Sequence, residues 1–263
     1  MLPEERRRAI LDHVRSSGSA DVAGMSGRLR VSAATIRRDL RLLEERGDLE
    51  RTHGGAVMPR LGTAYEPVYG DKLRRNAAAK SAIAARAATL VQDGEVVILD
   101  SGSTTLGLAE HLARRRNLTV VTSDLQIAVA LAAGSSVEVI VIGGRVRSSL
   151  FSVIGPSAES DLRALNADVA FLGADGISLT AGVTNANLEE AAIKQRMLEA
   201  GQRAVLLADH TKFGKTNLAK VCDVDAFDEI ITDEGIADED LAPYRLRNPH
   251  IVRVPCEVER SPC

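Results

Sequence analysis

The sequence predicts an α/β protein in two parts. A small, mainly helical part covers residues 1–60, and a larger part with a mostly parallel sheet covers 75–255. Apolar residues recur at helical spacing through the first 45 residues, and beyond residue 75 short uninterrupted apolar runs alternate with helical patterns. Such runs are typical of strands buried on both faces. Residues 61–74, where glycine and proline break the pattern, are expected to be a linker, and 256–263 a tail.

The composition limits the class of protein. With 45% hydrophobic and 26% charged residues among 263, the chain can bury a substantial core. The three cysteines, Cys222, Cys256 and Cys263, include no CxxC pair, which argues against a disulfide framework or a zinc site. No apolar stretch is long enough for a signal sequence or a membrane span. We therefore expect a cytoplasmic protein with no metal, no cofactor and no membrane partner.

Charge is distributed unevenly between the two parts. Residues 1–60 carry 12 Lys+Arg against 9 Asp+Glu, whereas the remainder carries 21 against 27. A basic head on an acidic body favours DNA binding by the head. Because aromatic residues make up only 3% of the chain, stacking platforms for single-stranded nucleic acid are not expected.

Three helices and a hairpin are predicted in the first part. The first helix covers Glu4–Arg15, and a second apolar pattern runs over 22–31. Ser32 is placed to cap the third helix, because its hydroxyl can accept from the opening N–H groups. Gly47 is expected to end that helix in the left-handed conformation, and β-like runs around His53–Gly55 predict a wing. Together these elements predict a winged helix-turn-helix.

The third helix has one apolar and one basic face. If the stripe Ile36, Leu40 and Leu43 faces inward, the small residue Ala33 and the other small residues and arginines of the helix face outward. The start of the helix can then enter a major groove roughly 12 Å wide. Asp39 is expected to hold one of these arginines in place. The alternative is a solvated face with pairs such as Arg41–Glu45, which leaves the cap and the wing unexplained. The expected DNA-contacting residues are Ser32, Ala34, Thr35, Arg37, Arg38, Arg41, Arg51 and His53.

Seven apolar runs of the second part read as strands. They are EVVILD, LTVVTS, VEVIVIGG, DVAFLG, AVLLAD, EIITD and HIVRV. In parallel sheets, ligands bind outside the carboxyl ends of the strands. The polar residues that follow the strands are therefore the expected ligand site: Asp100, Ser101, Gly102, Ser103, Thr104, Thr105, Thr122, Ser123, Gly143, Gly144, Asp175, Lys194, Asp209 and Lys212.

The run Asp100–Thr105 is the most informative of these. Gly102 lets the backbone approach a ligand, and hydroxyls and N–H groups at the start of the next helix form a cradle for a phosphate. An ordinary serine/threonine helix cap is the alternative. Lys212 or Lys194 could supply positive charge, although either could equally be a surface lysine. The P-loop echo Gly214-Lys215-Thr216 lacks its upstream glycine, and no GxGxxG occurs.

The head resembles that of DeoR-type transcriptional regulators. The matching residues are Val31-Ser32-x-x-Thr35-Ile36-Arg37-Arg38-Asp39-Leu40, Leu43-Glu44-x-x-Gly47 and Arg51-x-His53-Gly54-Gly55-Ala56. Gly24 and Gly27 in the second helix depart from the family pattern. They are expected to cost about 1 kcal/mol each relative to alanine.

The body resembles the DeoR sensor domain. The matching pieces include Arg75-Asn76, Lys80, Ile83-Ala84, Asp100–Thr105, Gly143-Gly144, Gly155, Gly182-Val183-Thr184, Lys194 and Ala208-Asp209-His210-x-Lys212-Phe213-Gly214. The resemblance implies a fold similar to ribose-5-phosphate isomerase and an effector that is a phosphorylated sugar or polyol. Ser123 stands where the family usually has asparagine, which could change which sugar fits.

A sugar-phosphate isomerase with an attached DNA-binding head is the alternative to a regulator. The related isomerases carry an Asp-Gly-Ala-Asp-Glu run, whereas this chain has Leu172-Gly173-Ala174-Asp175-Gly176. The leading carboxylate is missing, and proton transfer requires a titratable group there. A two-lobed periplasmic-binding-type sensor would need more residues than remain.

We therefore expect a repressor of carbohydrate metabolism. A dimer or tetramer would bind operator DNA, and a phosphorylated sugar or polyol would release it.

Overall fold

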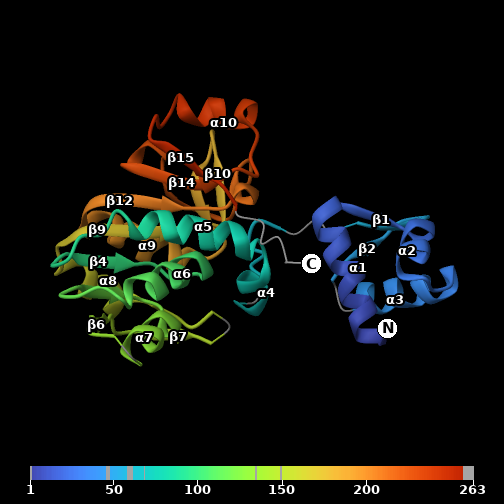
Figure 1. Ribbon diagram of the computed structural model, residues 1–263, viewed down its shortest axis with the longest axis horizontal. Coiled ribbons are helices and arrows are strands. Elements are labelled where there is room, and N and C mark those ends of the chain that lie inside the picture. Colours follow the sequence, from blue (N-terminus) through green and yellow to red (C-terminus); the bar gives the residue numbers. More distant parts are fainter. Residues whose placement is uncertain are drawn as a thin grey trace, which may run out of the picture. The chain divides into compact units, whose positions relative to one another are not determined.

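A computed structural model describes residues 2–45, 48–57, 62–67, 69–133, 135–148 and 150–256. The chain divides into two compact units, Met1–Gly62 and Thr63–Cys263, which we call the head and the body (Figure 1).

Three helices and a small sheet make up the head. In chain order the elements are α1 (Pro3–Ser17), β1 (Ser19–Asp21), α2 (Val22–Leu29), α3 (Ala33–Glu45), β2 (Glu50–Arg51) and β3 (Gly55–Val57). Strand β3 lies between β1 and β2 and pairs antiparallel with both. The β2–β3 hairpin is the predicted wing, so the winged helix-turn-helix is confirmed.

The core of the head forms around the predicted stripe of α3. Ile36, Leu40 and Leu43 are buried and cluster with Ile10 and Val14 of α1. An amphipathic helix this short is stabilised mainly by burial of its apolar face against its neighbours. Gly47, the expected end of the helix, lies outside the described residues.

Strand β1 was not predicted, because three residues are too few to show alternation. It pairs closely with β3 at Gly55, where a Cβ atom would lie 1.9 Å from the carbonyl oxygen of Ala20. Asp21 ends the strand and caps α2, since its carboxylate accepts a hydrogen bond from the amide of Gly24 at 2.7 Å.

The body is built on one seven-stranded sheet. Every neighbouring pair is parallel, and the order is β15-β14-β12-β9-β4-β5-β6. The strands are β4 (Val96–Leu99), β5 (Thr119–Thr122), β6 (Glu138–Val141), β9 (Ala167–Gly173), β12 (Gly201–Leu207), β14 (Glu229–Asp233) and β15 (Ile251–Val254). All seven apolar runs predicted as strands therefore belong to this sheet, and their carboxyl ends share one edge.

Helices cover both faces of the sheet (Figure 1). On one face lie α5 (Ala77–Ala88), α6 (Ser103–Leu112) and α7 (Leu125–Ala132), and on the other α8 (Pro156–Arg163), α9 (Leu188–Ala200) and α10 (Asp238–Arg245). Side chains of a strand alternate between the two cores. Ile98 belongs to the core beside α9, whereas Val97 and Leu99 belong to the core beside α5 and α6.

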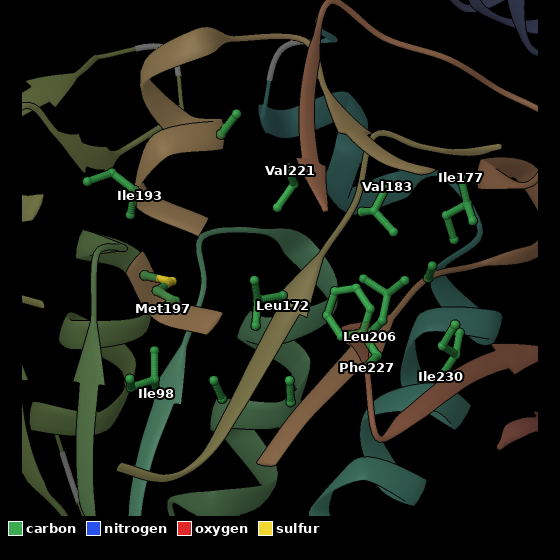
Figure 2. Packing of buried hydrophobic residues seen from close by; sticks show 14 of the residues in the cluster. Ile98, Leu172, Ile177, Val183, Ile193, Met197, Leu206, Val221, Phe227 and Ile230 are labelled. Atoms are coloured by element: carbon green, nitrogen blue, oxygen red, sulfur yellow. The ribbon is translucent and has the colours of Figure 1, made fainter. Parts of the chain in front are cut away.

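Figure 2 shows the core on the α9 side. Ile98, Leu172 and Leu206 of neighbouring strands lie in one cluster with Ile193 and Met197 of α9. A small antiparallel sheet adds its own side chains to this cluster. Its strands, in the order β10-β11-β13, are β10 (Gly176–Ser178), β11 (Gly182–Asn185) and β13 (Ala219–Cys222).

Several short elements have no prediction from the sequence. They are α4 (Tyr69–Arg74), β7 (Arg145–Arg147), β8 (Ser152–Ile154), the 3₁₀ turns η1 (His210–Lys212) and η2 (Val224–Ala226), the small antiparallel sheet, α8 and α10. Residues 63–67 and 69–74, expected to be linker, belong to the body. Tyr69 is buried there, and its ring meets Phe151 edge-on with ring centroids 5.6 Å apart. Because this partner is distant in sequence, local composition did not reveal the contact.

Cys222 and Cys256 are free thiols, and Cys263 lies outside the described residues. None of the helices in the described part of the chain combines the length and the apolar composition that spanning a bilayer requires.

Candidate functional site

The start of α3 is fixed by Ser32. Its hydroxyl accepts a hydrogen bond from the amide of Thr35 at 3.2 Å, and its carbonyl accepts from the amide of Ile36 at 3.1 Å. The predicted N-cap is therefore confirmed. Ser32 is exposed and Thr35 is half-buried, so the capped end of the helix is open to a partner.

The outer face of α3 is exposed and basic. Ala34, Arg37, Arg38 and Arg41 are all exposed. Among the residues that the structure describes, no hydrogen bond or ion pair engages the guanidinium groups of these three arginines. Three unpaired cations behind a small residue suit contact with phosphates and base edges in a major groove.

Two expectations for this helix are wrong. Asp39 does not hold an arginine of its own helix, because its buried carboxylate, 2% exposed, binds arginines of α1. It accepts hydrogen bonds from Arg6, with Nε–Oδ2 at 2.6 Å and Nη2–Oδ1 at 3.3 Å, and Arg7 Nη1 lies 3.6 Å from Oδ1. Ala33 does not face outward but packs against the core of the head. Packing of α1 on α3 brings these groups together, and helical spacing within α3 does not encode that contact.

The wing carries the other two residues expected at DNA. Arg51 donates from its backbone amide and its guanidinium to Glu44, at 3.2 and 3.3 Å, so this cation is already paired with α3. His53 and Gly54 are exposed in the turn, which the Thr52 amide closes on the Gly55 carbonyl at 3.0 Å.

The body's polar residues gather at the carboxyl edge of the central strands. The neighbouring strands β5, β4, β9 and β12 end in the loops that contain Thr122–Asp124, Asp100–Thr105, Gly173–Asp175 and Asp209–Lys212. Helices α5 and α6 both begin at this edge, because each runs antiparallel to the strands it joins. The edge therefore combines loop side chains with helix N–H groups.

The loop before α6 leaves polar groups unused. Ser101, Ser103 and Thr104 are half-buried, and within the described chain no hydrogen bond engages their hydroxyls. Gly102 has φ of +154° as it turns from β4 into α6. The first N–H groups of the helix have no partner within the helix, so hydroxyls and amides here can receive an anion.

Thr105 and Gly102, both expected at the ligand, already have partners within the protein. Thr105 is fully buried, and its hydroxyl donates to the Gly102 carbonyl at 2.9 Å. The Gly102 amide donates to Asp124 at 3.2 Å. Asp124 was not predicted as part of the site. Burial raises the pKa of its carboxyl to about 6, although it also accepts from the amides that open α7.

Asp100 and Lys194 form a buried ion pair. They are 1% and 3% exposed, and the Lys194 ammonium donates to Asp100 and, at 3.0 Å, to the carbonyl of Gly173. Asp100 also accepts from the Gly173 amide at 2.9 Å. Lys194 is therefore neither a surface lysine nor an unpaired charge. The pair joins the residue after β4 to β9 and α9, and it fixes these elements against one another at the candidate site.

Asp175 and Asp209 stay charged because cations surround them. Burial alone would raise the pKa of Asp209, but Lys212 and hydrogen bonds from Thr211 and Asn76 outweigh it, so the pKa is lowered. The same balance, with Lys72 and Lys212 as the main opposing charges, lowers the pKa of Asp175.

Two lysines give this edge an available positive charge. Lys212 is half-buried in η1, and no hydrogen bond or ion pair of the described residues involves its ammonium group. Lys80 on α5 is 9% exposed and donates to the carbonyl of Lys72. Burial, reinforced by the neighbouring cations Lys212 and Arg75 against the attraction of Asp209, lowers the pKa of Lys80 to about 8.

Lys80 also connects the edge to a pocket. A hollow of about 160 Å³ lies between α4, α5 and α6, and both Lys80 and Ser103 line it. Lys80 is absent from the predicted site residues. The signal that could have revealed it is its place in the first turns of the helix preceding β4, which must begin at the same edge as the loops.

The remaining predicted residues have structural partners. The Thr122 hydroxyl donates to the Leu99 carbonyl at 2.8 Å and accepts from Asp124, and Ser123 is buried with its carbonyl bonded to Val153. Gly143 and Gly144 are exposed beyond β6, away from β9 and β12 in the strand order. The Gly143 amide donates to Asp161, and a Cβ at Gly144 would lie 2.6 Å from a backbone oxygen of β8.

A winged helix-turn-helix with an exposed basic helix, in one chain with an α/β body, defines the class as a two-domain DNA-binding protein. Two family models match: the DeoR-like helix-turn-helix domain over residues 6–60 and the DeoR C terminal sensor domain over 75–234. The chain belongs to the DeoR family of transcriptional regulators.

Relatives match over most of their length. The chain is 38% identical to the HTH-type transcriptional regulator GlpR of Haloferax volcanii, over 91% of this chain and 93% of that protein. It is 33% identical to the transcriptional repressor AccR of Agrobacterium fabrum, over 95% and 97%. Ribose 5-phosphate isomerase A of Methanocaldococcus jannaschii aligns over 51% of this chain and 53% of its own, at 20% identity and a TM-score of 0.37.

Proposed function

We propose that the chain is a transcriptional repressor of a carbohydrate-metabolism operon that a phosphorylated sugar or polyol releases from its operator. The exposed face of α3 would lie in the major groove, with Arg37, Arg38 and Arg41 on base edges and phosphates. A single small head gives limited affinity, so the active form would be a dimer or tetramer that places two heads on paired half-sites.

One observation carries the effector proposal. At the start of α6 no described residue forms a hydrogen bond with the hydroxyls of Ser101, Ser103 and Thr104, and the Lys212 ammonium, at the same edge of the sheet, has no hydrogen bond or ion pair within that part of the chain. A helix start with free hydroxyls and a nearby cation is the combination that binds a phosphate. Asp175 and Asp209, both kept charged, can accept hydrogen bonds from the hydroxyls of a sugar or polyol.

Binding without turnover agrees with the same geometry. Leu172, which stands where the related isomerases have a carboxylate, is fully buried in the core (Figure 2). Asp175 already accepts from the Ala186 amide at 3.1 Å and faces Lys72 at 3.5 Å, so it lies in a fixed, paired environment. The isomerase alternative would require sugar-phosphate conversion at enzymatic rates, and we expect none.

The test is a thermal-shift screen of the full chain. Glycerol 3-phosphate, ribose 5-phosphate and fructose 6-phosphate are compared with their unphosphorylated counterparts and with inorganic phosphate. Binding to the native state raises the melting temperature by an amount that grows with ligand concentration. We expect at least one phosphorylated compound to raise it and its unphosphorylated counterpart to have no effect.

Matched variants locate the site. Ser103→Ala and Lys212→Met should remove the shift, while Ser157→Ala, in the first turn of α8, and Lys220→Met, in an exposed pair with Asp223, should retain it. If no phosphorylated compound shifts the wild-type chain, or if the two site variants bind as well as the two controls, the effector site is wrong.

A further inference from the structure

The first residues of the body form a connecting segment with its own anchors. We call residues 63–67 and 69–74 the strap, because they follow the head in the sequence and end where α5 begins. Any signal carried along the chain between the two units passes through them. Each of the three attachments of the strap described below is made to an element of the candidate effector site.

The first attachment is at the start of the strap. The carbonyl of Thr63 accepts from the backbone amide of Leu218 at 3.0 Å and from the side-chain amide of Asn217 at 3.3 Å. Both donors end the loop that begins at Lys212, a cation of the candidate effector site. A shift of this loop toward a bound anion therefore acts directly on the residue where the strap enters the body.

The second attachment is an ion-pair network. The Lys72 ammonium lies 2.7 Å from Glu66 Oε1 and 3.5 Å from Asp175 Oδ1, so one cation bridges the strap and the loop after β9. Arg147 binds the other oxygen of Glu66 at 2.8 Å and contacts Glu190 of α9. These groups are largely buried, so their interactions are screened less than those of a surface pair.

The third attachment is made by Lys80. Its ammonium donates to the carbonyl of Lys72 on α4, and its charge is attracted by Asp209 and repelled by Lys212. A phosphate dianion near Lys80 and Lys212 would compete with that carbonyl for the ammonium protons, because a charged acceptor is stronger than a neutral one. The same anion would compete with Glu66 and Asp175 for Lys72.

We infer that the strap is the element that couples the effector site to the head: an anionic effector draws Lys72 and Lys80 from their partners in the strap and loosens it. This inference rests on the proposed function, because it assigns the regulation of the same site. It names a packed element that the effector site contacts and that leads along the chain to the head, and coupling requires that binding of DNA by the head also bias this element.

Glu66→Gln tests the inference, because Glu66 anchors the strap without belonging to the effector site. Glu229→Gln is the matched control: it removes the same charge from an ion pair of 2.8 Å with Arg86, at the opposite edge of the sheet. Operator affinity of the full chain is measured on a duplex selected from random sequences by the wild-type protein. Each measurement is made with and without the sugar phosphate that gives the largest thermal shift.

In the wild type and in Glu229→Gln we expect that compound to weaken operator binding by roughly 5- to 150-fold, the usual range of allosteric coupling. In Glu66→Gln the two affinities should differ by less than twofold, although the thermal shift with the compound is retained. Hydrogen exchange of the Leu218 amide in the wild type should speed up when the compound binds, because its acceptor is the strap carbonyl.

The outcomes separate the two proposals. Absence of binding by the wild type to every compound overturns the proposed function and this inference with it. Normal binding together with undiminished release of the operator by Glu66→Gln overturns only the strap. Arg147→Gln, which removes the second anchor of Glu66, guards against misfolding of one variant: full coupling in a folded Arg147→Gln also overturns the inference.

Discussion

Asp39 gives the sharpest stability prediction, because its ion pair holds α1 against the helix that would read DNA. Its carboxylate is 3% exposed, and the partner Arg6 side chain is 12% exposed. Asp39→Asn removes the charge and one acceptor while retaining the shape, which leaves a mostly buried guanidinium with a single weak partner.

The magnitude lies between two limits. Breaking a fully buried pair costs about 3–5 kcal/mol, and an exposed pair contributes about 1 kcal/mol or less. Two hydrogen bonds to a charged group, with one donor partly open to solvent, place Asp39→Asn at about 2–3 kcal/mol. The control is Glu44→Gln on the same helix, whose pair with Arg51 is 42% and 37% exposed and should be worth less than about 1 kcal/mol.

Hydrogen exchange of the α3 amides in the full chain measures the opening free energy of the head. Asp39→Asn should lower it by about 2–3 kcal/mol, a large part of the stability of so small a unit. The reasoning would be refuted by a loss no greater than that of Glu44→Gln.

Three further predictions follow from the described contacts. Gly27→Ala should stabilise the head by about 1 kcal/mol in the same exchange experiment, because nothing lies within 4 Å of the added Cβ. Gly24→Ala should give no such gain, because its Cβ would lie 2.6 Å from the Asp21 carboxylate that caps α2, and equal gains for the two variants would contradict this prediction. Arg37→Ala and Arg38→Ala should each abolish operator binding in a gel shift yet retain the thermal shift with sugar phosphate; unchanged gel shifts would remove α3 from the interface. Burial lowers the pKa of Lys80 to about 8, and a bound anion should raise it again, so Lys80 should take up a proton when a sugar phosphate binds near pH 8. The affinity for the sugar phosphate should therefore fall as the pH rises above 8. Calorimetry in buffers of different ionisation enthalpy detects the proton uptake, and the same uptake by Lys80→Met would exclude this lysine.

Features that depend on neighbouring residues could be predicted from the sequence. The stripe Ile36, Leu40 and Leu43, the cap at Ser32 and the seven apolar strands follow from periodicity and from hydrogen bonds a few residues long. Strand order and direction then place the loops at one edge, because parallel strands joined by helices must end together. That is why most of the predicted loop residues lie at the same edge of the sheet.

The roles of individual side chains were harder to predict. The sequence presented Thr105 as a ligand hydroxyl and Lys194 as an uncommitted charge, whereas one bonds within its own turn and the other neutralises Asp100 in the core. Lys80 and Asp124 belong to the edge through burial and through charges from distant segments. The amino-acid sequence alone does not show which carboxylate pairs with which cation.

The sequence by itself determined a basic helix with an apolar inner face, a sheet of parallel strands and a family, because each rests on local spacing that hydrophobic burial and helix capping enforce. Only the tertiary structure decided which charges remain available. Arg6 reaches Asp39 across 33 positions and Lys72 reaches Asp175 across 103, and such partners are chosen by packing, which fixes distance and desolvation for all of them at once. Within the described residues, that packing leaves the three exposed arginines on α3 and Lys212 without a hydrogen bond or ion pair, and they are the groups from which a function can be proposed.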